Sequence, residues 1–281
     1  MKKDLILLHI AVLLFGLSGL FGKLINSPAE IIVSGRVVSA TIFLYIILKL
    51  KKEKVYLFSA ANIKIILFQG SLLFLHWFSF FQSIKLSTVA LGLLSFSSFP
   101  VFTTFMEPLL LKVPLERKKV IIAFITLMGI SVVTPVGSLD PHMSKGILLG
   151  IFSGFSFALL AIVNKKLSKD ISGIKLTFYQ CFGASLCSIP VLFSNISMLP
   201  SGRDLLLLTA LGVIFTGIAH TLFVSSLKKV SASTVSVTTC LEPVYGIAFA
   251  AIFLGEIPGS KIILGSSLII MAAFSSAKTD K

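Results

Sequence analysis

The sequence contains few charged residues and few cysteines. Only 13% of its 281 residues are Asp, Glu, Lys or Arg, whereas soluble domains carry about 25%. This shortage, beside 56% hydrophobic residues, excludes a soluble two-domain enzyme and a disordered protein. The three cysteines all lie inside apolar stretches without a C-x-x-C spacing, so they indicate neither a disulfide framework nor a metal or redox pair. We interpret the chain as an integral membrane protein.

Motifs for nucleotides, nucleic acids and metals are also missing. The P-loop pattern G-x-x-x-x-G-K-[ST] does not occur, so we expect no ATP hydrolysis. The net charge of +14 could suggest a nucleic-acid partner, but the basic residues form short clusters between apolar runs. No histidine has a second ligand three or four residues away, so we expect no metal site. No cofactor is expected either.

The apolar runs have the length of membrane-spanning helices. A bilayer core about 30 Å thick needs roughly 17–25 apolar residues per helix. Continuous apolarity over such lengths favours helices over barrel strands, which would alternate. We therefore predict an all-α polytopic membrane protein with ten transmembrane helices, at 5–22, 31–48, 65–83, 88–111, 120–136, 146–163, 176–193, 205–227, 233–254 and 262–277.

The basic residues predict how the chain is oriented. With the N-terminus inside, nineteen Lys and Arg residues fall on the inner side, five fall on the outer side, and Arg36 lies within a helix. Because basic residues in short loops stay on the cytoplasmic side, both termini should be cytoplasmic. The apolar N-terminal run has no convincing cleavage site, so we expect a retained first helix. Short loops and the absence of targeting signals indicate a bacterial cytoplasmic membrane.

The two halves of the chain resemble each other at an offset of 142–144 residues. Four matches occur in the same order in both halves, which is unlikely to arise by chance. They are Phe15–Lys23 with Phe157–Lys165, His76 with His220, Ser83–Lys85 with Ser226–Lys228, and Pro100 with Pro243.

This repeat predicts a transporter. We expect a first five-helix repeat at 1–136 and a second at 146–281. Because five is an odd number, the second repeat must enter the membrane from the opposite side. Inverted repeats of this kind place a binding site near the midplane, where the halves meet, and rocking of one half exposes that site alternately to each face.

At this point the chain resembles the drug/metabolite transporter superfamily, in its EamA-type branch. The most family-like stretch runs from Leu241-Glu242-Pro243-Val244-Tyr245 to Phe253-Leu254-Gly255-Glu256. Its counterpart in the first half keeps Pro100 but has Lys112-Val113 in place of the Gly-Glu pair. The resemblance covers essentially the whole chain. It implies transport of a small solute, by export of amino acids, amines, drugs or other metabolites, or by import.

Glu242 is the leading candidate for a substrate-binding or coupling residue, because a charge inside a bilayer is costly and usually functional. Pro243 removes a backbone N–H directly after it, so Pro243 and Pro100 are hinge candidates. The alternative for Glu242 is a fixed structural ion pair. Tyr245, in the same family-like stretch, is a further candidate for substrate binding.

Histidines and aromatic residues supply the other candidates. His76 and His220 hold related positions and could carry protons, since the unperturbed pKa of histidine is near 6.5; the alternative is a neutral imidazole bonded to a neighbouring helix. Trp77 and nearby phenylalanines could hold amines by cation–π attraction, although lipid-facing phenylalanine is common. Arg36 could pair with an anionic substrate, but we interpret it as structural, with its charge reaching outward.

The function we predict is secondary transport by alternating access, in the form of export of an amino acid or related amphipathic solute. The expected partners are this substrate and the lipid bilayer, with proton coupling and a homodimer as options that the sequence leaves open. The alternatives are an importer of a small organic cation such as choline and an intramembrane lipid-modifying enzyme. We expect no enzymatic activity, because the ionisable groups are scattered.

Overall fold

The computed structural model describes residues 2–55, 60–133, 140–194 and 200–277, and within these ranges the chain contains helices and no strands. The helices of the first half are α1 (Lys2–Leu24), α2 (Ala29–Leu50), α3 (Ala60–Leu86), α4 (Val89–Phe96), α5 (Phe99–Leu111) and α6 (Arg117–Val133). Those of the second half are α7 (Pro141–Leu167), α8 (Gly173–Ser194), α9 (Gly202–Gly212), the π-helix η1 (Val213–Ile218), α10 (Ala219–Ser226), α11 (Ala232–Thr239), α12 (Glu242–Leu254) and α13 (Ser260–Ala277).

The long helices have the apolar character of membrane spans. Within the described residues, seven continuous stretches are long and apolar enough to cross a membrane, and each coincides with a predicted span. The predicted spans 120–136, 233–254 and 262–277 coincide with α6, with α11 and α12, and with α13, which are shorter or interrupted; residues 134–136 lie outside the described part. The chain is therefore a multi-pass membrane protein of helices.

The sequence repeat is visible in the positions where helices are interrupted. Residues 89–96 and 99–111 form α4 and α5, and residues 232–239 and 242–254, each 143 positions later, form α11 and α12. Both second segments end at a residue with a left-handed backbone, Lys112 with φ 55° and Gly255 with φ 69°. In these segments the two halves share their helix boundaries residue by residue.

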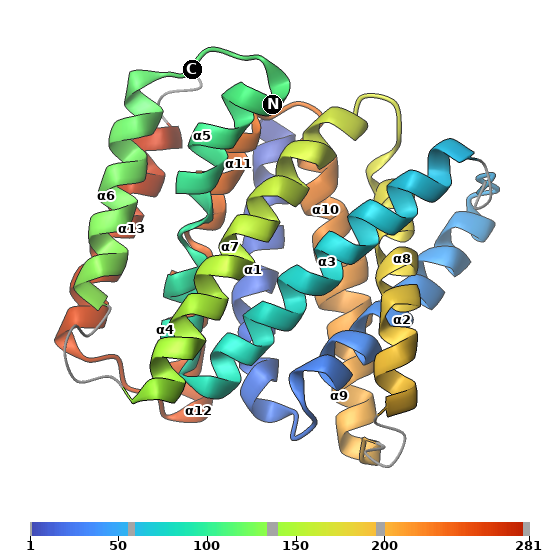
Figure 1. The fold of residues 1–281 in the computed structure, drawn as a ribbon, viewed down its shortest axis with the longest axis horizontal. Coiled ribbons are helices and arrows are strands. Elements are labelled where there is room, and N and C mark those ends of the chain that lie inside the picture. Colours follow the sequence, from blue (N-terminus) through green and yellow to red (C-terminus); the bar gives the residue numbers. More distant parts are fainter. Residues whose placement is uncertain (1, 56–59, 134–139, 195–199, 278–281) are drawn as a thin grey trace.

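The halves are interlocked and not merely side by side. α1 packs against α10 and α12 of the second half, and α7 packs against α3, α4 and α5 of the first. The first helix of each half is therefore inserted into the other half. α6 and α13, the last helices of the two halves, pair with each other at one flank of the bundle (Figure 1).

The start of α1 and the end of α13 lie at the same end of the bundle, at the top of Figure 1. α4 and α11 run in opposite directions in this view, as inverted repeats require. The interior between the halves contains buried apolar side chains together with buried arginine, histidine and glutamate side chains. Buried ionisable groups inside a membrane-spanning bundle are usually functional. The centre of the bundle is therefore the candidate site.

Candidate functional site

A small cavity lies where helices from both halves meet. Its volume is about 20 Å³, which is room for about one water molecule. All of its lining side chains are buried. They come from α1, α2, α3, α4, α7, α10 and α12, and they are Phe15, Ser18, Arg36, His76, Trp77, Phe80, Phe96, Phe157, His220 and Glu242.

Glu242 is the first residue of α12, directly after the interruption that ends α11. Pro243 follows at a position where its missing N–H breaks no helical hydrogen bond. The N-terminus of a helix also presents free N–H groups and the positive end of the dipole, which stabilise a carboxylate. α1 comes very close here, since a Cβ added to Gly16 would lie 2.9 Å from the Glu242 carbonyl oxygen. The helix interruption therefore places this carboxyl group at the boundary between the halves.

His76 is bonded to the second half of the chain. Its Nδ1 lies 2.8 Å from the Ser153 hydroxyl and 3.2 Å from the Ser153 carbonyl oxygen on α7. Its ring also lies 4.7 Å from that of Phe157 and 5.4 Å from that of Phe96, centre to centre. One ring nitrogen is thus used between helices, as the structural alternative expects, while the side chain also lines the cavity.

His220 ends a chain of buried polar groups. Its Nε2 lies 2.8 Å from Oε1 of Gln180 on α8. The amide of Gln180 donates to Oδ1 of Asn164 on α7, and Gln69 on α3 donates to the same oxygen at 2.7 Å. This polar chain connects helices of both halves. The sequence analysis missed it, because isolated amides in apolar segments give no pattern.

Arg36 is the cavity residue that the sequence analysis misjudged. Its side chain does not reach outward; the residue is 1% exposed, with its guanidinium carbon 3.8 Å from the centre of the Trp77 ring. Its Nε donates to the Thr216 hydroxyl at 2.9 Å. Thr216 lies in η1, and short π-helical segments occur frequently at functional sites. One signal in the sequence could have pointed to Arg36. Arg36 lies 144 residues before Gln180, which is the same offset as between His76 and His220.

The structure brings together four of the five predicted binding or coupling residues, namely His76, Trp77, His220 and Glu242. Tyr245 is half-buried on α12 but does not line the cavity. It lies beside Gly16, because a Cβ added to Gly16 would be 2.8 Å from the Cβ of Tyr245. Pro100 and Pro243 lie at the second positions of α5 and α12, next to the helix interruptions and outside the lining.

The cavity contains one guanidinium, one carboxyl group and two imidazoles. Arg36 comes from the first half and Glu242 from the second, and no ion pair joins these two described residues. Within the described ranges, no three His, Cys, Asp or Glu side chains are grouped so that they could hold a metal ion. The arrangement suits recognition of charged or polar groups between aromatic walls.

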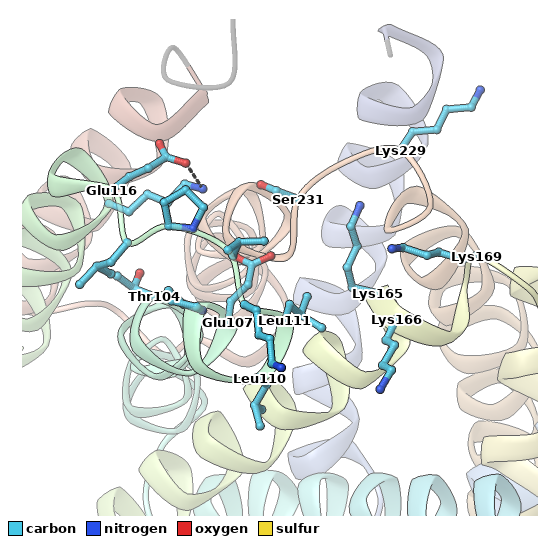
Figure 2. A pocket seen from close by; sticks show the side chains of 16 residues that line it. Thr104, Glu107, Leu110, Leu111, Glu116, Lys165, Lys166, Lys169, Lys229 and Ser231 are labelled. Atoms are coloured by element: carbon cyan, nitrogen blue, oxygen red, sulfur yellow. Dashed lines mark ion pairs between the residues drawn. The ribbon is translucent and has the colours of Figure 1, made fainter.

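A larger pocket of about 680 Å³ opens where α5 and α7 end. Lys165, Lys166, Lys169 and Lys229 gather on one side of it, opposite Glu116 (Figure 2). Glu116 forms an ion pair with Lys119 at 2.8 Å. The excess of lysines favours anionic groups at this end of the bundle.

Comparisons with known proteins agree with this architecture. A crystal structure of another protein aligns with a TM-score of 0.77 at 16% identity, covering 98% of both chains, which shows a shared fold. An uncharacterized transporter, YxxF of Bacillus subtilis, is 24% identical over 92% of this chain and 85% of its own length.

Two further relatives have named substrates. The S-adenosylmethionine uptake transporter of Rickettsia felis is 27% identical over 73% of this chain and 68% of its own length. The pseudopaline exporter CntI of Pseudomonas aeruginosa is 22% identical over 90% of this chain and 88% of its own length. These proteins are named as working in opposite directions, so the likeness carries no direction for this chain.

The family model confirms the resemblance to the drug/metabolite transporter superfamily. The model of the EamA-like transporter family matches twice, at residues 2–134 and 144–277. The two matches cover both halves and nearly the whole sequence. Together with the helical membrane fold and the buried cavity between the halves, they lead to one conclusion: the chain belongs to the EamA-like transporter family.

Proposed function

We propose that this protein is a secondary transporter of the cytoplasmic membrane that exports an amino acid or related amphipathic solute by alternating access. The observation that carries the proposal is the buried polar cavity at the interface of two inverted halves. Charged groups inside an apolar bundle are costly and are retained where they bind or couple. The cavity has a volume of only about 20 Å³, so in this mechanism the halves must move apart to admit a solute.

The architecture that goes with this proposal has ten spans, with repeats at 1–136 and 146–281 and both termini in the cytoplasm. The equal positions of the helix interruptions in the two halves support it. In this mechanism, Pro100 and Pro243 mark hinges where α5 and α12 tilt against the rest of the bundle. Because the halves are inverted copies, inward-open and outward-open states can have similar energies.

The residues we assign to substrate binding or coupling are Glu242, His76, His220, Trp77 and Tyr245. The first four line the cavity, and Tyr245 lies on the same helix as Glu242, at its contact with α1. Substrate contact with these residues from both halves would tie occupancy of the site to the relative position of the halves.

Reconstitution into proteoliposomes tests the proposal. We expect saturable counterflow of a radiolabelled neutral amino acid, and loss of most of this flux in Glu242→Gln. Glu53→Gln is the matched control, since Glu53 forms a half-exposed ion pair with Lys175 away from the cavity and such pairs contribute little. Unsaturable flux would identify a channel, and absence of flux for every solute class would overturn the proposal.

Proton coupling is part of the proposal, because Glu242, His76 and His220 share the cavity with only Arg36 as a further charged group. An imposed pH gradient should then change the rate of counterflow or drive accumulation. Flux that is unchanged by the gradient would exclude coupling while leaving transport intact.

The second candidate is import of an organic cation such as choline, favoured by the aromatic residues around the cavity. The position of Arg36 argues against it, because the guanidinium already lies over the Trp77 ring and repels another cation. Competition of choline with amino-acid flux would support this candidate. A lipid-modifying enzyme would require product formation by the purified protein, and we propose that none occurs.

A further inference from the structure

Arg36 has hydrogen-bonding capacity that the protein leaves unused. Its Nε is bonded to Thr216 and its flat face lies against Trp77, but its Nη1 is fully buried and has no hydrogen-bond partner. A buried N–H without a partner costs free energy, more so on a charged group. Because Arg36 lines the cavity, the unused donor lies at the place where a bound molecule would sit.

The remaining contacts hold the guanidinium in one orientation. Stacking on Trp77 occupies a face of the plane, and the bond to Thr216 fixes one edge, so the other edge stays available. The planar fork of arginine matches a carboxylate with two parallel hydrogen bonds. An anionic pair of oxygen atoms is therefore the group that would complete the hydrogen bonding of Arg36.

Glu242 supplies the complementary charge from the other half of the chain. It is 4% exposed, lines the same cavity, and forms neither an ion pair nor a hydrogen bond through its carboxylate with any described residue. Two opposite buried charges that stay apart are each poorly compensated. A molecule with an anionic and a cationic end compensates both at once.

We propose that the site recognises a zwitterion, with Arg36 binding the carboxylate and Glu242 the ammonium group of an amino acid. This inference rests on the proposed transport function and deepens it. The substrate would bridge α2 of the first half and α12 of the second, so that binding ties the halves together. A simple amine is repelled by Arg36, and a simple carboxylate is repelled by Glu242.

The aromatic residues determine how the remainder of the substrate fits. The present volume of about 20 Å³ holds no amino acid, so binding requires the halves to move apart and the rings of Phe96 and Phe157 to separate. An apolar substrate side chain would then take the space between these rings. Neutral amino acids with apolar side chains are accordingly the expected substrates.

The test uses neutral L-amino acids, each with two derivatives that lack one charge. The amino-acid amide removes the carboxylate, and the N-acetyl amino acid removes the ammonium group. Binding to the purified full chain is measured by calorimetry. We expect at least one amino acid to bind and both of its derivatives to bind about 30-fold more weakly or worse, as for loss of one partner of a buried charged contact.

Variants assign each charge to its residue. Arg36→Gln should bind the amino acid and its amide equally, and Glu242→Gln should bind the amino acid and its N-acetyl derivative equally. The controls Arg203→Gln, at an exposed site, and Glu53→Gln should keep the wild-type ratios. If a cavity variant does not fold, the derivative series on the unchanged protein still decides between a zwitterion and a singly charged ligand.

An amide that binds as tightly as its parent would overturn the inference, and so would a panel in which no amino acid binds. Counterflow of another solute class, such as choline, would in that case leave the proposed transport function standing. Failure of all counterflow would overturn transport itself. The two hypotheses therefore fail by different measurements.

Discussion

The two interrupted helix pairs, α4–α5 and α11–α12, share a backbone and differ in chemistry. Both break at the same place and carry a proline at the second position of the following helix. Yet Phe99 begins α5 and is fully buried, whereas Glu242 begins α12 and lines the cavity. The two halves thus share helix geometry while the side chains at equal positions differ, and among the described residues that line the cavity only Glu242, from the second half, supplies a carboxyl group.

The same contrast appears where α1 and α7 cross the opposite half. Gly16 and Ala158 are equivalent positions, but α1 has a glycine there, and a Cβ added to it would lie 2.9 Å from the Glu242 carbonyl oxygen. Asn164 on α7 accepts hydrogen bonds from Gln69 and Gln180, whereas the equivalent Gly22 packs against Ile84 and Phe81. Substitutions at such equivalent pairs test whether residues at equal positions in the two halves contribute equally to the stability of the protein.

The largest effect is expected for Gly16→Ala. The new Cβ would lie 2.8 Å from Cβ of Tyr245 and 3.0 Å from the Gly246 nitrogen, so α1 and α12 must separate. We expect a loss of about 3 kcal/mol, measured by thermal unfolding in detergent, together with loss of flux. The equivalent Ala158→Gly should cost only about 1 kcal/mol. Equal effects at both positions would show that the close contact is absent.

Asn164→Ala should have the next largest effect. The change removes the acceptor shared by the amides of Gln69 and Gln180, both of which are fully buried. Because these buried donors would then have no acceptor, the free energy of unfolding should fall by about 2 kcal/mol. Asn26→Ala, on an exposed residue, is the matched control and should change stability by less than about 0.5 kcal/mol. Equal unfolding temperatures for the two variants would contradict the hydrogen-bond network.

Replacement of the repeat-related lysines compares one interaction in both halves. Lys165 donates to the carbonyl oxygens of Leu227 and Val230 at 2.8 and 2.7 Å, and Lys23 donates to that of Ser87 at 2.8 Å. Lys165→Met should therefore cost about 1.5 kcal/mol and Lys23→Met about half of this, because fewer carbonyl groups lose a charged donor. Unfolding curves of both variants in the same detergent measure these losses. A larger loss of stability for Lys23→Met than for Lys165→Met would contradict the prediction.

The smallest effect concerns the left-handed residues that end α5 and α12. Lys112 adopts φ 55° at the position where the second half has Gly255, and a side chain in this conformation costs about 1 kcal/mol. Lys112→Gly should accordingly stabilise the protein by about 0.5 kcal/mol. Gly255→Lys should destabilise it by about 1 kcal/mol, from backbone strain alone, since no atom lies within 4 Å of an added Cβ. Changes of the same sign would contradict the shared geometry.

Much of the architecture was predictable because its signals are local. Apolar runs of membrane length predicted helices that the structure contains, and the hinge candidates Pro100 and Pro243 each lie next to a helix interruption. The candidate site was only partly predictable. His76, His220 and Glu242 stand out as polar residues in apolar segments, and the structure brings them to one cavity. Arg36 was predicted to be structural with an outward-reaching charge, because the sequence does not reveal which side of α2 faces the interior of the bundle.

Hydropathy and internal repetition thus indicate the class of protein, the helices and the twofold plan, because each of these follows from residues near one another in the chain or from equal spacing. Tertiary packing alone decided that Arg36 lies on Trp77, that Thr216 holds its Nε, and that Glu242 lies across the cavity without an ion pair. The physical reason is that helix rotation and the crossing of the two halves are set by close backbone contacts, such as that of Gly16 with α12. These contacts join residues more than 200 positions apart.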